Sequence, residues 1–269
     1  MDHHPIFSHF DRSEFISDSF LGTVSRRCFT SEAMREKVTA CDPLGLPAFN
    51  EEYFEWIDLL ESIKAWKPGS LYTFMELGAG YGRWSVRAAF ARPLARIIAV
   101  EAEPTHYVWM KQNFEDNGLQ GDRFKTIQAA VSDTPGLCGF LTGRPAEWYG
   151  QRVAEPRELT GRLEDGRVVS CVTLPELFKL VTLVDLIDMD IQGMEYRAIS
   201  AGIDDLNAKV KRLHIATHDP ETEVNLRRAF HQEGWRMAWD FSGGGTNATP
   251  FGLIEFQDGV QSWVNKRFE

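Results

Sequence analysis

The chain has 269 residues, of which 43% are hydrophobic and 25% are charged, which are ordinary values for a globular protein. Its net charge of −10 disfavours nucleic acid as a substrate, because binding to phosphates needs basic surface. The sequence has no apolar run near the roughly 20 residues that span a bilayer, and its polar start is no signal peptide. We therefore expect a cytoplasmic protein with neither a nucleic acid nor a membrane as its partner.

The first part of the chain is predicted to be an appendage. Residues 1–49 are mixed and turn-rich, and we expect them to form a lid or appendage before a main domain at residues 50–269. Two roles are open for this segment, which are to cover a pocket or to build the subunit interface of a homo-oligomer. Asn50 is then predicted to cap a helix, because apolar residues recur at helical spacing until Pro68 and Gly69.

A glycine-rich turn follows this helix. The mainly apolar run from Leu71 to Leu77 breaks into three alternating glycines, Gly78, Gly80 and Gly82, and then becomes helical. Glycines allow a tight turn and a close backbone approach, and the next helix offers unpaired N–H groups. The pattern is typical of a nucleotide-type cofactor site at the end of a parallel strand.

Two residues beside the turn discriminate between cofactors. A dinucleotide fingerprint needs a small residue where this chain has Arg83, which we expect at the surface. Glu76 would repel a pyrophosphate, but its carboxylate can face the ammonium group of S-adenosylmethionine. A nicotinamide-dependent oxidoreductase is therefore an alternative that the turn disfavours.

A second cofactor element is expected about 20 residues further along the chain, where a strand ends in an acidic residue. The apolar run from Ala95 ends at Glu101, and we predict that this carboxylate accepts hydrogen bonds from both ribose hydroxyls. Glu103 fits better as an acid at a helix start. Gln128 and Ala129, at the end of the third strand, are predicted to border the adenine.

Together these motifs resemble the class I S-adenosylmethionine-dependent methyltransferases, and more narrowly the FkbM family. The narrower likeness rests on residues 98–104, 129–133 and 184–195, and the ordered set spans roughly residues 71–240. The resemblance implies an α/β, Rossmann-like fold with a mostly parallel seven-stranded sheet and an antiparallel C-terminal hairpin. The cofactor-binding positions are then Glu76, Gly78, Ala79, Gly80, Gly82, Glu101, Ala102, Gln128, Ala129 and Asp190.

The remaining strands are read from pattern changes. They are predicted at Phe124–Val131, Leu183–Asp190, Val210–Thr217, Trp235–Phe241 and Phe251–Phe256, the last two forming the closing hairpin. Residues 136–173 interrupt this order as an insertion, and inserted loops on the ligand face often set specificity. Trp148, Tyr149 and Gln151 are therefore candidate substrate contacts. An equal alternative is that Trp148 and Tyr149 only anchor the insertion on the core.

The chemistry is expected at the end of the fourth strand. Family members usually carry a K-x-D-x-E-G-x-E pattern there, but this chain has Asp188 for the lysine and Gln192 for the first glutamate. Asp190, Gly193 and Glu195 retain the rest of the pattern. The departure removes a positive charge, and it places in doubt any role taken over from the lysine or from the first glutamate.

Two interpretations of the catalytic site are open. His218 follows the fifth strand and is predicted to be the general base, oriented by Asp190, because a hydroxyl must lose its proton to attack the sulfonium methyl group. By analogy with similar sugar O-methyltransferases, Asp190, His218 and Asp219 could instead bind Mg²⁺. His214 is expected to be a structural histidine and His106 a surface residue.

Three functions are compatible with the sequence. The resemblance favours an S-adenosylmethionine-dependent O-methyltransferase that acts on a hydroxyl of a small molecule such as a sugar, a polyketide or another natural product. The alternatives are the nicotinamide-dependent oxidoreductase and a cofactor-binding protein that has lost transfer activity with its altered fourth-strand motif.

Overall fold

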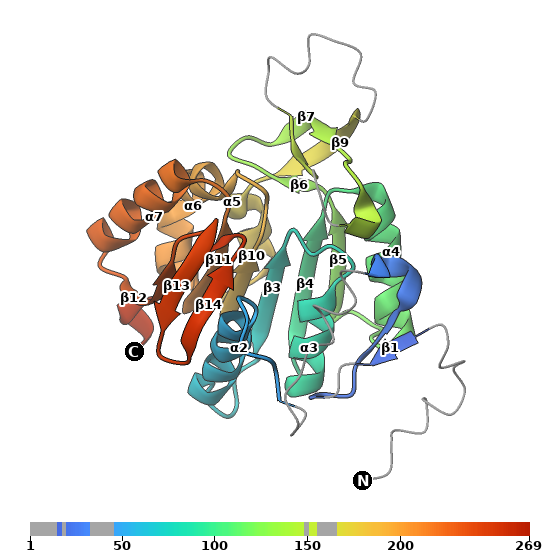
Figure 1. The fold of residues 1–269 in the computed structure, drawn as a ribbon, viewed down its shortest axis with the longest axis horizontal. Helices are drawn as coiled ribbons and strands as arrows, with labels where there is room; N and C mark the ends of the chain where they lie inside the picture. Colours follow the sequence, from blue (N-terminus) through green and yellow to red (C-terminus); the bar gives the residue numbers. More distant parts are fainter. Residues whose placement is uncertain (1–14, 18–19, 33–45, 148–150, 155–165) are drawn as a thin grey trace.

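A seven-stranded sheet forms the centre of the protein (Figure 1). The computed structural model describes residues 15–17, 20–32, 46–147, 151–154 and 166–269. In chain order the strands of this sheet are β3 (Thr73–Leu77), β4 (Arg96–Glu101), β5 (Phe124–Gln128), β10 (Leu186–Met189), β11 (Arg212–Thr217), β12 (Arg236–Phe241) and β15 (Gly259–Val264). Their spatial order is β12-β15-β11-β10-β3-β4-β5, and β15 runs antiparallel to both of its neighbours. This arrangement confirms the predicted Rossmann-like fold.

The partner of the closing strand β12 differs from the prediction. Residues 251–256 were expected to pair with it, but β14 (Gly252–Phe256) instead pairs with β13 (Gly245–Thr249) in a separate hairpin. The true partner, β15, is buried along all six residues, whereas β14 buries only Ile254 and Phe256. A strand inserted between two others needs cover on both faces, and only Gly259–Val264 meets that requirement.

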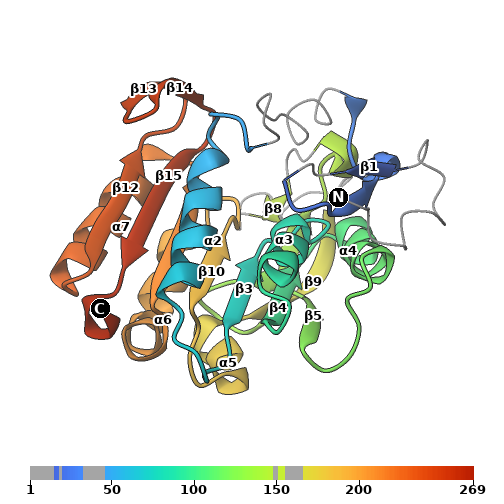
Figure 2. The same cartoon turned by 90° about the horizontal axis from the view of Figure 1, so that it is seen from below.

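Helices cover both faces of the sheet (Figures 1 and 2). On one face lie α2 (Tyr53–Ala65), α3 (Arg83–Ala91) and α4 (Pro104–Asp116), and on the other lie α5 (Leu174–Leu177), α6 (Glu195–Lys209) and α7 (Pro220–Gln232). The prediction that Asn50 caps α2 is wrong by two residues. Glu52 holds the N-cap position, and its carboxylate makes an ion pair with Arg83 rather than bonding the helix start.

The two faces of the sheet differ in polarity. Side chains that face α5, α6 and α7 form an apolar core, which includes Met75, Leu77, Ile187 and Met189. On the opposite face a polar row crosses four adjacent strands in register, with Glu76 beside Asp188, Asp188 beside His214, and His214 beside Ser262. All four are buried beneath α2 and α3. Burying polar side chains costs free energy unless they are paired, so these four residues are candidates for a functional role as well as a structural one.

The insertion forms its own small sheet above the carboxyl edge of the central one (Figure 1). The sheet consists of β7 (Gly136–Leu141), β8 (Arg152–Val153) and β9 (Gly166–Val172) of the insertion together with β6 (Ala130–Val131), which precedes it, in the order β6-β9-β7-β8. The predicted third strand, Phe124–Val131, therefore divides at Ala129 between the two sheets.

No helix in the described ranges is long and apolar enough to cross a membrane.

A short N-terminal segment, which includes β2 (Val24–Arg26), packs on α4. β1 (Phe15–Ser17) pairs with β2, and a short 3₁₀ helix, η2 (Arg27–Phe29), follows. The side chain of Asn117 makes two hydrogen bonds to the backbone of Val24. Its oxygen accepts from the N–H of Val24 at 3.0 Å, and its amide group donates to the carbonyl oxygen of Val24 at 2.8 Å. Further 3₁₀ helices are η3 (Pro145–Glu147), η5 (Phe178–Leu180) and η6 (Lys266–Phe268).

The glycine turn generates a stability prediction. Gly78 has φ +81°, and a Cβ there would lie 1.7 Å from the carbonyl oxygen of Asp190, whereas Gly80 has φ +55° and open space around it. Gly78→Ala should lower the free energy of unfolding by at least about 3 kcal/mol, because the backbone must move apart. Gly80→Ala should cost only about 1 kcal/mol, for the left-handed backbone alone. Urea denaturation of both variants measures the difference, and equal losses would contradict this account.

Candidate active site

A cavity of about 670 Å³ lies at the carboxyl edge of β3, β4, β10 and β11. This volume is within the range of roughly 300–1,000 Å³ that small-molecule sites occupy. The structure brings most of the predicted cofactor-binding positions together in its lining, namely Glu76, Gly78, Ala79, Gly80, Glu101, Ala102, Ala129 and Asp190.

Two predicted positions are not among the described lining residues. Gly82 has φ +75° at the start of α3, and a Cβ there would lie 2.7 Å from the ring of Phe114 and 2.9 Å from Met110. The packing of α3 against α4 therefore explains why a glycine is needed at position 82. Gln128 is exposed at the end of β5. A sequence pattern identifies the end of a strand, but the direction of the last side chain depends on where that strand stops.

Glu101 ties the end of β4 to the glycine turn. Its two carboxylate oxygens accept hydrogen bonds from the N–H groups of Gly80 and Glu103, each at 2.6 Å. Burial raises the pKa of Glu101 to about 8, although these hydrogen bonds act in the opposite direction. Each oxygen keeps a further lone pair, so the ionised group can still accept from hydroxyls in the cavity.

Glu76 holds the start of α3. Its carboxylate accepts hydrogen bonds from the N–H groups of Trp84 at 3.3 Å and Ser85 at 2.8 Å, where the helix dipole favours negative charge. Burial and the neighbouring charge of Asp188 nevertheless raise the pKa of Glu76 to about 8. The residue therefore has a structural task besides lining the cavity.

His218 lies between two carboxylates at the rim. Its Nδ1 is 2.9 Å from Oε1 of Glu195, and its Nε2 is 3.2 Å from Oδ1 of Asp190. Glu195 is fully buried and also accepts from the N–H groups of Ile191 and Gly193. Although burial disfavours the charged ring, the hydrogen bonds to both carboxylates raise the pKa of His218 to about 11.

This environment does not favour His218 as the general base. The carboxylates of Glu195 and Asp190 favour the charged form of the ring, although the Gln192 amide nitrogen also lies 2.8 Å from its Nε2, and His218 is not among the described residues that line the cavity. Asp190 and Gln192 do line it, and the Gln192 amide bonds Asp190 at 2.9 Å. Desolvation in the cavity raises the pKa of Asp190, although its side chain is 47% exposed, but the hydrogen bond and charge of His218 outweigh it, so this pKa lies below its usual value.

Sequence reasoning assigned no role to Glu195. The signal for it was present, because Glu195 is the last acid of the family pattern that this chain retains. Its carboxylate turns back to the strand end and holds Gln192 in a left-handed conformation, with φ +53°. A non-glycine residue with that backbone stores strain, which the hydrogen bonds around it must offset.

The predicted magnesium site is not assembled. The carboxylate of Asp219 accepts from the N–H of Thr222 at 2.8 Å as the N-cap of α7, and both ring nitrogens of His218 already contact carboxylates. Asp190, His218 and Asp219 therefore do not fit a common magnesium ion in this arrangement.

The predicted substrate residues are only partly described. Trp148 and Tyr149 lie outside the described residues. Gln151 is buried, lines the cavity and donates to the carbonyl oxygen of Thr142 at 3.2 Å. The insertion thus reaches the cavity through at least one of the three candidates.

Two residues expected at the surface also line the cavity. Arg83 is 2.6 Å from Glu52 with its side chain only 14% exposed, because the start of α2 folds over it. His106 is buried, and its Nε2 lies 2.8 Å from the carbonyl oxygen of Pro145. Both partners come from distant parts of the chain, so local sequence did not show them.

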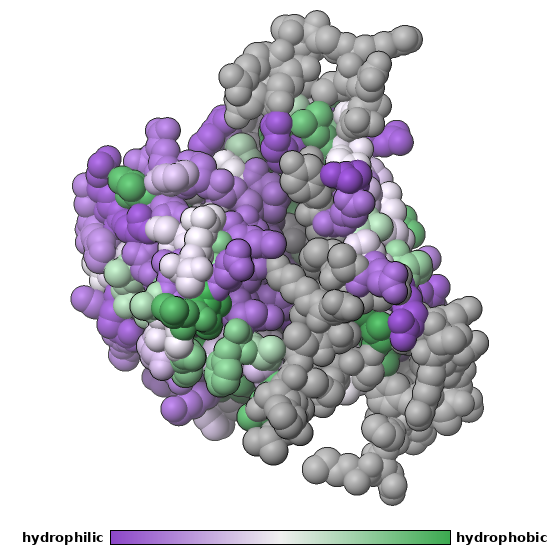
Figure 3. All heavy atoms as spheres, viewed as in Figure 1, coloured by the Kyte–Doolittle hydropathy of each residue, from purple (hydrophilic) through white to green (hydrophobic). Residues whose placement is uncertain are grey.

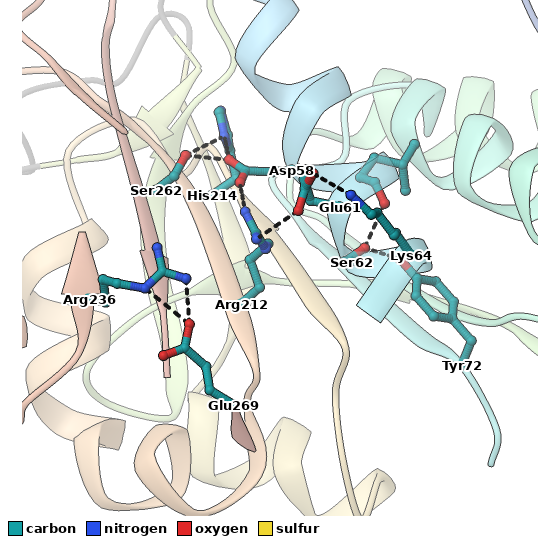
Figure 4. A network of polar contacts seen from close by, with 11 residues as sticks. Asp58, Glu61, Ser62, Lys64, Tyr72, Arg212, His214, Arg236, Ser262 and Glu269 are labelled. Carbon is teal, nitrogen blue, oxygen red and sulfur yellow. Dashed lines mark hydrogen bonds and ion pairs between the residues drawn. The ribbon is translucent and has the colours of Figure 1, made fainter. Parts of the chain in front are cut away.

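The polar row on the α2 face continues beneath the cavity (Figure 4). Asp58 of α2 is fully buried and accepts from His214 Nδ1 at 2.8 Å, from Arg212 at 2.6 Å and from the hydroxyl of Ser262. These contacts agree with the expectation that His214 is a hydrogen-bonded structural histidine.

Hydrophobic side chains gather at the β13–β14 hairpin (Figure 3). Phe251 and Leu253 are exposed there, and Phe49 stacks on Phe251 with ring centroids 5.8 Å apart. Phe54 of α2 and Phe256 lie beneath them in a buried cluster. The hairpin is thus anchored to α2 by aromatic packing.

Comparisons of the sequence with known proteins agree that it is a methyltransferase sequence. Residues 76–239, well over half of the chain, match the model of the methyltransferase FkbM domain. A protein of Jannaschia sp. (strain CCS1), provisionally named a methyltransferase, is 27% identical over 197 residues, which are 69% of each chain.

Solved structures resemble the chain more distantly. The methyltransferase FkbM from Methylobacillus flagellatus KT is 10% identical, with a TM-score of 0.48, over 72% of this chain and 43% of its own. The precorrin-6y C5,15-methyltransferase from Geobacter metallireducens GS-15 is 12% identical, with a TM-score of 0.45, over 77% and 86%. The N-terminal domain of human METTL16 in complex with SAH is 13% identical, with a TM-score of 0.45, over 98% and 94%. Likenesses of this size carry no inference about activity.

The raised pKa of Glu101 predicts how stability depends on pH. The folded protein retains a proton on this group up to about pH 8, while the unfolded chain loses it near the ordinary value of 4.5. Stability from this group is therefore present at low pH and is lost as the pH rises from 4.5 to 8. Between pH 5 and 8 the free energy of unfolding should fall by about 2 to 4 kcal/mol more in the wild type than in Glu101→Gln. Urea denaturation at several pH values measures this, and parallel curves would contradict it.

Proposed function

The chain belongs to the FkbM methyltransferase family, and from this premise we propose that it is an S-adenosylmethionine-dependent O-methyltransferase acting on a hydroxyl of a small molecule. The acceptor class that we propose is a sugar, a polyketide or another natural product. The observation that carries the proposal is that one cavity joins the glycine turn and Glu101 to Asp190.

The cofactor half of the cavity suits an adenosyl group. Gly80, Ala102 and Ala129 leave room beside the strand ends, and Glu101 is placed to accept from the ribose hydroxyls. Buried carboxyls at Glu76 and Glu101 suit a ligand that carries positive charge on its sulfur and its amino group. A volume of about 670 Å³ leaves space for a small acceptor beside the cofactor.

The acceptor hydroxyl is placed at Asp190 in this proposal. Its oxygen attacks the methyl carbon in line with the carbon–sulfur bond, which breaks and leaves the electron pair on sulfur. The oxygen becomes strongly acidic as the new bond forms, so even a carboxylate of low pKa can take its proton. Asp190 receives that proton, and His218 acts as a positioning residue that holds Asp190 ionised beforehand.

The oxidoreductase alternative is not favoured. The matched family is one of methyltransferases, and Arg83, where a dinucleotide fingerprint needs a small residue, is engaged by Glu52. A cofactor-binding protein without transfer activity differs from the proposal in one outcome, which is cofactor binding with no turnover of any hydroxyl acceptor.

Calorimetry tests the cofactor. S-adenosylmethionine and S-adenosylhomocysteine should each bind at one site per chain, while NAD should not bind. Glu101→Gln should weaken binding of both by at least about 10-fold, because the amide replaces one of the two acceptor oxygens with an NH₂ group that can only donate. Gln128→Ala is the matched control, since Gln128 ends the next strand but is exposed, and it should bind like the wild type. Binding of NAD alone would overturn the assignment.

Transfer activity tests Asp190. A panel of hydroxylated sugars and polyketides, incubated with methyl-labelled cofactor, should yield a methyl ether with at least one acceptor. Asp190→Asn should then lower kcat by about 100-fold or more, because the amide cannot receive the proton. Its affinity for S-adenosylhomocysteine should stay within about 3-fold of the wild type. An unchanged kcat would remove Asp190 from the chemistry.

A further inference from the structure

A second group of potential metal ligands lies at the floor of the same cavity. Glu55 of α2, Asp188 of β10 and His214 of β11 each offer one ligand atom, and these atoms lie within 4.8 Å of one another. All three residues line the cavity. The group shares no residue with the rim cluster of Asp190, Glu195 and His218.

The hydrogen bonds of His214 are arranged as they are around metal-binding histidines. Its side chain is only 4% exposed, and Nδ1 bonds the fully buried carboxylate of Asp58 at 2.8 Å, with Ser262 at 3.4 Å (Figure 4). Nε2, on the other side of the ring, has no hydrogen-bond partner among the described residues. A carboxylate that fixes one ring nitrogen while the other remains available is the arrangement found around metal-ligating histidines. The rim histidine, His218, lacks this property, because both of its nitrogens contact carboxylates.

The floor of the cavity also has an excess of negative charge. The carboxyl groups of Glu55 and Asp188 lie within 4.8 Å of each other, and the charges of Asp58 and Asp190 act on Asp188 as well. Asp188 stands where the family pattern has a lysine, and the nearby positive charges come instead from Arg83 and Arg87, which act on Glu55, and from Arg212, which pairs with Asp58. Two carboxyls in a buried site repel each other unless a proton or a cation lies between them.

We propose that Glu55, Asp188 and His214 bind one divalent transition-metal ion, Mn²⁺ or Zn²⁺, with Asp58 orienting His214. A set of two carboxylates and one imidazole suits these ions better than Mg²⁺. Ligand atoms about 2.0–2.2 Å from a common ion lie roughly 3.0–4.3 Å apart, so small side-chain movements close the site. The ion's remaining positions face the cavity.

This site would deepen the proposed function. A metal ion that faces the cavity can bind an acceptor hydroxyl and lower its pKa. This catalytic role rests on the proposed O-methyl transfer, whereas the binding of the metal does not.

Titration with Mn²⁺ alone tests the site. Full-length protein is first treated with a chelator, and free Mn²⁺ is then followed by electron paramagnetic resonance in the absence of S-adenosylmethionine. We expect one ion per chain. Asp188→Asn and His214→Gln should weaken binding by at least about 10-fold, and Asp58→Asn by about 10-fold, as for residues that orient a ligand. Asp190→Asn, in the rim cluster, is the matched control and should bind within about 2-fold of the wild type.

Two results would overturn the proposal. One is that the wild type binds no Mn²⁺, and no Zn²⁺ by calorimetry, up to about 1 mM, a concentration well above the affinity of a built site. The other is that Asp190→Asn abolishes binding while Asp188→Asn retains it. Asp188→Asn removes a repulsive charge and should fold even if His214→Gln does not, which circular dichroism checks. Because cofactor binding is measured separately, failure of the metal site leaves the methyltransferase proposal standing, and the reverse also holds.

Discussion

The arrangement of the cavity depends on the hydrogen bonds that the carboxylate of Asp58 accepts. A buried carboxylate costs several kcal/mol unless donors surround it, and three donors from β11 and β15 meet Asp58. They fix α2 against the sheet at one depth and one rotation. Glu55 lies three residues earlier on the same helix face, and Glu52 is the N-cap residue of this helix, so the same contact sets where Glu55 meets Asp188 and where Glu52 meets Arg83.

Local sequence patterns predicted the parts of the fold that depend on local physics. Glycines that need a positive φ, and a strand that ends in an acid about 20 residues later, were readable from the sequence alone, and Gly78, Gly80 and Glu101 line the cavity as expected. The family likeness then supplied the mostly parallel seven-stranded sheet. The exposed end of β5 at Gln128 marks the limit of this approach, because one residue of register reverses the direction of a side chain.

Contacts between distant residues were not predictable in this way. Glu195 and His218 are 23 residues apart, and the Glu195 carboxylate helps to raise the pKa of the histidine. The closing strand was misplaced for a related reason. Phe251–Phe256 and Gly259–Val264 are both apolar enough to form strands, and only the space between β11 and β12 selects the second.

The position of β15 also constrains the order in which the molecule can assemble. This strand follows every other strand of the sheet in the chain, yet it lies between β11 and β12, which are synthesised before it. Until it inserts, β12 has no partner in the sheet and Asp58 lacks Ser262, which lies 204 residues later. The cavity floor is therefore completed only after nearly the whole described chain has left the ribosome, and a nascent chain would hold the glycine turn well before it held a finished site.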